Sequence, residues 1–71
     1  MEIKTTERLE VLLAHWINHN NEHAAEYERW AQRAQDEGLD DISAAIRTAA
    51  TTTAQSNDSL RKALNLLDRS S

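Results

Sequence analysis

The feature that most constrains the fold of this chain is its lack of helix-breaking residues, because 71 residues contain one glycine and no proline. The glycine, Gly38, lies in the stretch DEGLDD at residues 36–41. Glycine adopts the left-handed conformation at little cost and commonly follows the last turn of a helix. Asp40 is a good N-cap for a following helix, and Asp41 would place negative charge in its first turn. The pattern predicts helices over about 6–37 and 41–68.

The two predicted helices are joined by a short loop and should therefore lie antiparallel, as an all-α helical hairpin. We treat residues 1–71 as one domain, with Thr5 or Thr6 as the cap of the first helix and the tail DRSS as frayed. A two-helix hairpin of this size cannot enclose a core. We therefore expect two copies to form a homodimeric four-helix bundle.

The charge and hydropathy of the chain limit its partners. The formal net charge is −4, which disfavours binding to nucleic acid or to an anionic membrane surface. No apolar run approaches the roughly 20 residues of a membrane-spanning helix, and the N-terminus lacks a signal-peptide core. We therefore expect a cytoplasmic protein without nucleic acid or membrane partners. The absence of cysteine excludes a disulfide framework and a thiolate metal site.

Helical wheels with about 100° per residue predict which side chains point inward. On the first helix one face collects most of the large apolar residues, namely Leu9, Leu12, Leu13, Trp16, Tyr27, Trp30, Ala31 and Ala34. On the second helix the corresponding face holds Ile42, Ala45, Ile46, Ala49, Leu60, Ala63, Leu64 and Leu67. We interpret the three aromatic residues, Trp16, Tyr27 and Trp30, as core or dimer-interface residues.

Both predicted faces are apolar at their ends and polar in the middle. The stretch HWINHNNEH, residues 15–23, contains all three histidines at intervals of four residues. His19, Asn20 and His23 are predicted to point inward, whereas His15 lies at the edge of the face and Asn18 and Asn21 point outward. Folding about the turn brings this group opposite the hydroxyl-bearing residues of the second helix, which are Thr52, Thr53, Ser56 and Ser59.

This polar layer suits a transition metal ion. Two histidines four residues apart on a helix project to the same side and can share one ion. Imidazole is a good ligand for Zn, Cu, Ni or Fe. The candidate ligands are His19 and His23, with His15 and Glu26 as further ligands, or with the same histidines of a second chain. Asn20, Thr52, Ser56 and Ser59 could orient the imidazoles through hydrogen bonds.

A metal-free interpretation remains open beside this one. A buried polar layer can fix the register and the oligomeric state of a helical assembly, and each buried polar group needs a hydrogen-bond partner. The chain would then be an assembly or adaptor module, and a small-molecule pocket is a third alternative. We do not expect an enzyme, because no nucleophile motif, phosphate-binding loop or paired inward carboxylates are present.

The stretch HWINHNNEHAAEYERWAQRAQDEGLDDI resembles a family of small helical-hairpin domains from bacteria and archaea. The family pattern is His-Trp-x-x-His-Asn-x-x-His, followed by an aromatic residue, Trp-Ala and a Gly-Leu turn. The matching positions are His15, Trp16, His19, Asn20, His23, Tyr27, Trp30, Ala31, Gly38 and Leu39. The resemblance covers about residues 9–67. Related segments occur beside nickel-binding accessory proteins of carbon monoxide dehydrogenase maturation, so the resemblance implies a metal-handling context and a partner in metalloenzyme maturation.

Overall fold

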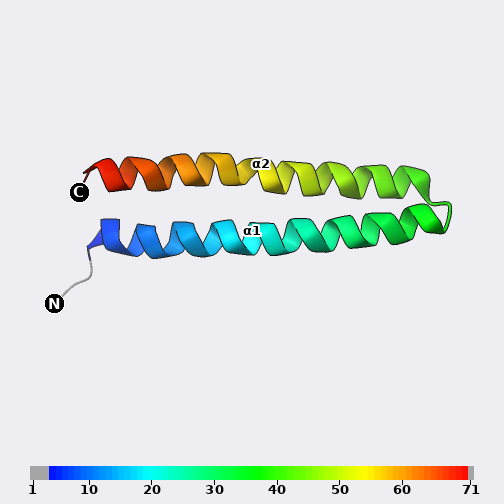
Figure 1. The fold of residues 1–71 in the computed structure, drawn as a ribbon, viewed down its shortest axis with the longest axis horizontal. Helices are drawn as coiled ribbons and strands as arrows, with labels where there is room; N and C mark the ends of the chain where they lie inside the picture. Colours follow the sequence, from blue (N-terminus) through cyan, green and yellow to red (C-terminus); the bar gives the residue numbers. More distant parts are fainter. Residues whose placement is uncertain (1–3, 71) are drawn as a thin grey trace.

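The computed structural model describes residues 4–70, which form two long helices side by side (Figure 1). Helix α1 spans Thr5–Asp36 and helix α2 spans Asp40–Ser70. The helices run antiparallel, so both termini lie at one end and the turn lies at the other. The hairpin measures 56 × 21 × 11 Å, a single layer of helices. The predicted all-α hairpin is therefore confirmed, with helix limits within two residues of those expected. No helix in the described part of the chain is long and apolar enough to cross a membrane.

The turn forms because Gly38 adopts a positive φ of 79°. Its N–H donates to the Gln35 carbonyl at 3.0 Å, and the Leu39 N–H donates to the Ala34 carbonyl at 2.8 Å. This pair of bonds is the Schellman arrangement, which satisfies carbonyls that a helix end would leave free. The predicted role of Gly38 is confirmed.

The predicted caps are less accurate. Helix α1 begins after Lys4, whose side chain makes no cap hydrogen bond, so Thr5 and Thr6 lie inside the helix instead of capping it. Helix α2 begins at Asp40, and the Ser43 N–H donates to the Leu39 carbonyl at 2.9 Å. Asp40 and Asp41 therefore both lie in the first turn, where negative charge is favourable. The tail was predicted to fray, but Asp68–Ser70 is helical; Ser71 lies outside the described residues.

The two helices meet along a heptad pattern that we call the seam. Its positions alternate in steps of three and four residues, the period of a coiled coil. On α1 the seam is Leu13, Ile17, Asn20, Ala24, Tyr27, Ala31 and Ala34, all buried or half-buried. On α2 it is Ser43, Ile46, Ala50, Thr53, Asn57, Leu60, Leu64 and Leu67, also buried or half-buried.

Small side chains bring the helices close together near the turn. Ala31 is completely buried, and Ala34 and Ala50 are nearly so. The hydroxyl of Ser43, also buried, donates to the Ala31 carbonyl across the seam at 2.7 Å. A polar side chain is stable in this position because its hydrogen bond is satisfied.

The predicted pairing levels agree with the structure, but the predicted rotation of each helix is wrong. Asn20 meets Ser56 and Asn57, within the hydroxyl-bearing stretch that was predicted to lie opposite His19, Asn20 and His23. However, Trp16, Trp30, Ile42, Ala45 and Ala49 are exposed, whereas the seam contains Ile17, Ala24, Ser43 and Asn57, which the wheels did not place there. A straight wheel of 3.6 residues per turn drifts by ~20° per heptad from a 3.5-residue seam. The wheel therefore assigned the residues of the seam and those of a neighbouring apolar stripe to the same face.

Candidate functional site

A polar layer crosses the seam at mid-length and centres on Asn57, which is 1% exposed. The Asn57 amide donates to the Asn21 side-chain oxygen at 2.8 Å and to the Ile17 carbonyl at 3.2 Å. Its oxygen accepts a hydrogen bond from the Asn20 amide at 3.0 Å, and Asn20 also donates to the Ser56 hydroxyl at 3.2 Å. Among the described residues, no buried side-chain polar atom lacks a partner. The layer is therefore fully hydrogen-bonded without any added ligand.

The structure confirms only part of the polar layer that the sequence predicted. Asn20 and Ser56 meet across the helices as expected. Thr52 and Ser59 do not join them: both are exposed, and the Thr52 hydroxyl donates to the Thr48 carbonyl of its own helix at 3.0 Å. Asn21 is exposed as predicted, yet it accepts a bond from Asn57. Asn57 itself was not predicted, because the wheel placed Ala49 and Ser56 on the inner face, one residue before the seam positions Ala50 and Asn57.

Beside the seam lies an apolar surface that nothing in the hairpin covers. Because the helices are antiparallel, residues that immediately precede seam positions lie on the same side of the hairpin in both helices. We call this surface the uncovered face; it comprises Leu12, Trp16, His19, His23, Glu26, Trp30 and Arg33 of α1 and Ile42, Ala45, Ala49, Thr52, Ser56, Ser59, Ala63 and Leu66 of α2.

The histidines form a ladder along α1. Ring centroids lie 5.6 Å apart for His15 and His19, 4.4 Å apart for His19 and His23, and 6.0 Å apart for His23 and Tyr27. The Nε2 atoms of His19 and His23 converge to 3.0 Å. His19 is exposed and His23 is half-buried. Both were predicted to point inward, but both lie on the uncovered face instead of in the seam.

The chain by itself brings together only two of the predicted ligands. Within residues 4–70, no group of three or more histidine, aspartate or glutamate side chains is arranged to hold a metal ion. His15 and Glu26 are exposed, and the structure gathers neither of them with His19 and His23 into such a group. A metal bound here would keep open coordination positions for ligands from elsewhere.

The aromatic residues divide between the seam and the uncovered face. Tyr27 is half-buried in the seam, as expected for a core residue. Trp16 is 40% exposed and Trp30 is 53% exposed, so neither lies in the core of the hairpin, and their predicted place in a dimer interface stays a prediction. The Arg33 guanidinium lies 5.0 Å from the Trp30 ring centroid, within the range of a cation–π contact.

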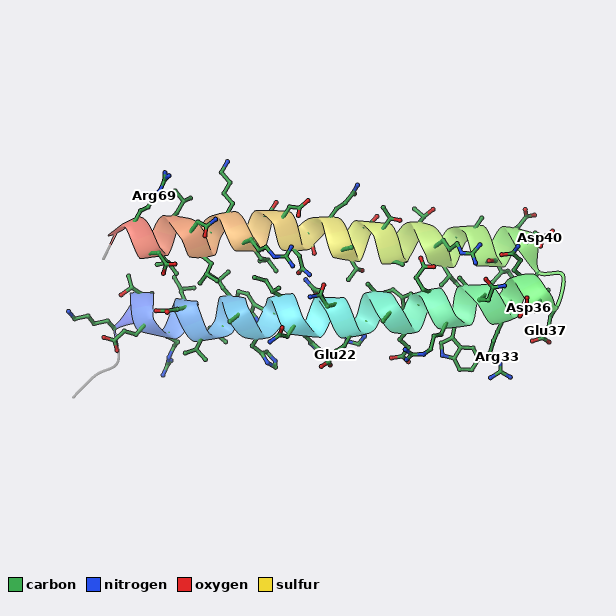
Figure 2. All side chains as sticks on the ribbon, viewed as in Figure 1. Glu22, Arg33, Asp36, Glu37, Asp40 and Arg69 are labelled. Carbon is green, nitrogen blue, oxygen red and sulfur yellow. The ribbon has the colours of Figure 1, made fainter. Side chains whose placement is uncertain are left out.

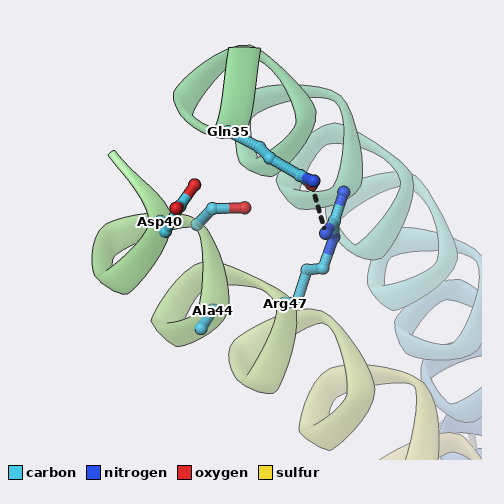
Figure 3. A pocket seen from close by; sticks show the side chains of 5 residues that line it. Gln35, Asp40, Ala44 and Arg47 are labelled. Atoms are coloured by element: carbon cyan, nitrogen blue, oxygen red, sulfur yellow. Dashed lines mark hydrogen bonds between the residues drawn. The ribbon is translucent and has the colours of Figure 1, made fainter. Parts of the chain in front are cut away.

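The opposite side of the hairpin is polar. Arg47 donates to Gln35 at 2.7 Å and to Gln32 at 3.0 Å, and it lies 3.7 Å from the Glu28 carboxylate. Figure 3 shows the Arg47–Gln35 bond beside a shallow hollow that is lined by Gln35, Asp40, Ser43, Ala44 and Arg47. The guanidinium is already bonded across the helices, so this hollow is part of the hairpin's own packing. In Figure 2, Glu22 and Arg33 point away from α2, and Arg69 points away from α1.

Comparison with protein families matches residues 9–67 to the family described as "Domain of unknown function (DUF8180)". The chain belongs to this family. The match spans both helices and the turn, and therefore includes the histidine ladder, the Asn57 layer and the uncovered face. The corresponding comparisons with curated proteins and with solved structures gave no match.

Proposed function

We propose that this protein binds a transition metal ion through the Nε2 atoms of His19 and His23. The observation that carries the proposal is their separation of 3.0 Å. Two imidazole nitrogens that each lie ~2.0–2.1 Å from one ion are ~2.9 Å apart at a right angle and ~3.4 Å apart in a tetrahedral site. The separation in the hairpin falls inside this interval, so both rings can bind one ion with little rearrangement.

The ion belongs to the group that imidazole prefers, namely Ni, Zn or Cu. The resemblance to segments that occur beside nickel-binding accessory proteins makes nickel the first ion to test. It also supports a role in metal handling, with a metalloenzyme-maturation protein as the partner.

Isothermal titration calorimetry with Ni²⁺, Zn²⁺, Cu²⁺ and Co²⁺ tests the proposal. We expect at least one ion to bind more tightly than ~1 mM, which corresponds to ~4 kcal/mol. His23→Ala should abolish this binding and leave the hairpin folded, because His23 lies outside the seam. Asn18→Ala is the matched control, since it truncates an exposed polar side chain of the same stretch of α1 outside the uncovered face and should leave the ion in place. If none of the four ions bound within that limit, the proposal would fail.

A second candidate function is a metal-free assembly module, and the Asn57 layer favours it. A single buried asparagine can fix the register and the oligomeric state of paired helices. In that case the 3.0 Å contact is a hydrogen bond in which one imidazole nitrogen donates and the other accepts. His23→Leu separates the candidates: an assembly module keeps its oligomeric state and binds no metal before or after the change, whereas a metal protein loses its ion.

A further inference from the structure

The uncovered face exposes several large apolar side chains to water. Trp16 and Trp30 are joined there by Ile42 and Leu66, each 52% exposed. Among the described side chains, the buried residues of the hairpin are only Leu13, Ala31, Ser43, Ala34, Ala50 and Asn57. Large apolar side chains therefore remain exposed beside the seam, as expected for half of a larger bundle.

A second copy of the same chain fits this face, because apolar residues lie toward both ends of the face and polar residues lie at its centre. On α2 it runs from Ile42, Ala45 and Ala49 through Thr52 and Ser56 to Ala63 and Leu66. On α1, Trp16 and Trp30 flank His19 and His23. A twofold axis directed along or across the helices therefore brings apolar ends onto apolar ends and polar centres onto polar centres.

The distribution of charge permits this pairing. The hairpin's interhelical ion pair, Arg47 with Glu28, lies on the opposite side. The uncovered face contains one acidic and one basic residue, Glu26 and Arg33, whose formal charges cancel. The face therefore carries no net formal charge that would repel a second copy.

The size of the face is sufficient for a stable dimer. The hairpin is 56 Å long and 21 Å wide. Covering most of one side would bury on the order of 800 Å² per protomer, the area of a standard stable interface. Facing helices in such bundles lie ~8–10 Å apart, a gap that imidazoles from the two sides can span.

We infer that a second copy covers this face and that His19 and His23 of both protomers form one metal site with four nitrogen ligands at the centre of a four-helix bundle. This inference rests on the proposed function. The histidine pair lies near mid-length of α1, which spans residues 5–36, so a twofold axis directed across the helices sets the α1 helices of the two copies against each other with their histidine pairs face to face. The second protomer supplies the ligands that one chain lacks.

Titration calorimetry and sedimentation velocity on the full chain, with Ni²⁺ and with Zn²⁺, test the inference. We expect one ion per two chains and a shift from monomer toward dimer when the ion is added. Trp30→Glu places a charge on the face without removing a ligand, and it should weaken metal binding by at least roughly tenfold and prevent the shift. Ala25→Glu is the control, since it adds the same charge at an exposed position of α1 outside the uncovered face, and it should behave as wild type. Circular dichroism verifies that each variant remains helical.

The outcomes separate the two proposals. One ion per chain bound to a monomer, or a Trp30→Glu variant with unchanged metal affinity, would overturn the shared site and leave metal binding by the single hairpin intact. Failure of every ion to bind would overturn the proposed function and, with it, the shared site. A metal-free dimer would then favour the assembly module.

Discussion

Replacing Asn57 with alanine probes the polar layer that aligns the two helices. The substitution removes three hydrogen bonds, to Ile17, Asn20 and Asn21, from a residue that is 1% exposed. A hydrogen bond contributes ~0.5–1.5 kcal/mol net, so the loss should total about 3 kcal/mol. Alanine regains roughly 0.7 kcal/mol because it favours the helix more than asparagine does. The net destabilisation should be about 2 kcal/mol.

Thermal unfolding monitored by circular dichroism measures this effect. For a domain of this size, 1 kcal/mol corresponds to ~4–8 °C, so Asn57→Ala should lower Tm by about 10 °C. All samples need the same protein concentration, because association makes Tm depend on concentration. Asn65→Ala is the matched control: Asn65 is an exposed asparagine on the same helix, and its replacement should leave Tm unchanged or slightly raised. If Asn57→Ala melted within ~2 °C of wild type, the layer would not hold the hairpin together as described.

Three further predictions concern the turn, the seam and the histidines. Gly38→Ala should lower the free energy of unfolding, measured by chemical denaturation, by ~1–2 kcal/mol. Backbone strain is the only cause, because φ is +79° and a Cβ at this position would meet open space. Equal stability of variant and wild type would show that the turn has rearranged. Ala31→Leu should destabilise the hairpin by ~1–3 kcal/mol, since Ala31 is fully buried where the helices approach closely, whereas Ala25→Leu, at an exposed position of the same helix, should have little effect on the same melting curve. Acidification should weaken Ni²⁺ binding in calorimetry, because an imidazole must be unprotonated to bind a metal; a pH-independent affinity would exclude histidine ligands.

The sequence was sufficient to predict the two helices, their turn and their alignment. Gly38 was the only candidate for a sharp turn, and counting outward from it placed Asn20 opposite the stretch 52–59, which contains its actual partner Ser56. The alignment depends on the length of the connection and little else, so a short loop predicts it well.

The rotation of each helix could not be predicted in the same way. Leu13 and Trp16 are both apolar, and a single wheel places both on one face, yet Leu13 is buried in the seam and Trp16 is exposed. A helix with two apolar stripes gives one averaged direction, and only the partner helix decides which stripe it covers. Here close packing favoured the stripe with alanines and serine, because small side chains let the backbones approach.

The same ambiguity affected the candidate site. The predicted polar layer divided into two parts: Asn20, Asn57 and Ser56 hydrogen-bond between the helices, whereas His19 and His23 lie together on the uncovered face. Side chains of both parts are polar and lie at the same level, so the sequence pattern alone could not separate them. Their different packing implies separate roles: the amides align the helices, and the imidazoles are available to a ligand.

The most direct test of metal binding by His19 and His23 is anomalous X-ray diffraction from crystals grown with Ni²⁺, recorded at the nickel absorption edge. Our account predicts one anomalous peak ~2.0–2.1 Å from the Nε2 atoms of both rings. Well-ordered His19 and His23 rings joined to each other by a hydrogen bond, with no anomalous peak between them at saturating Ni²⁺, would contradict it.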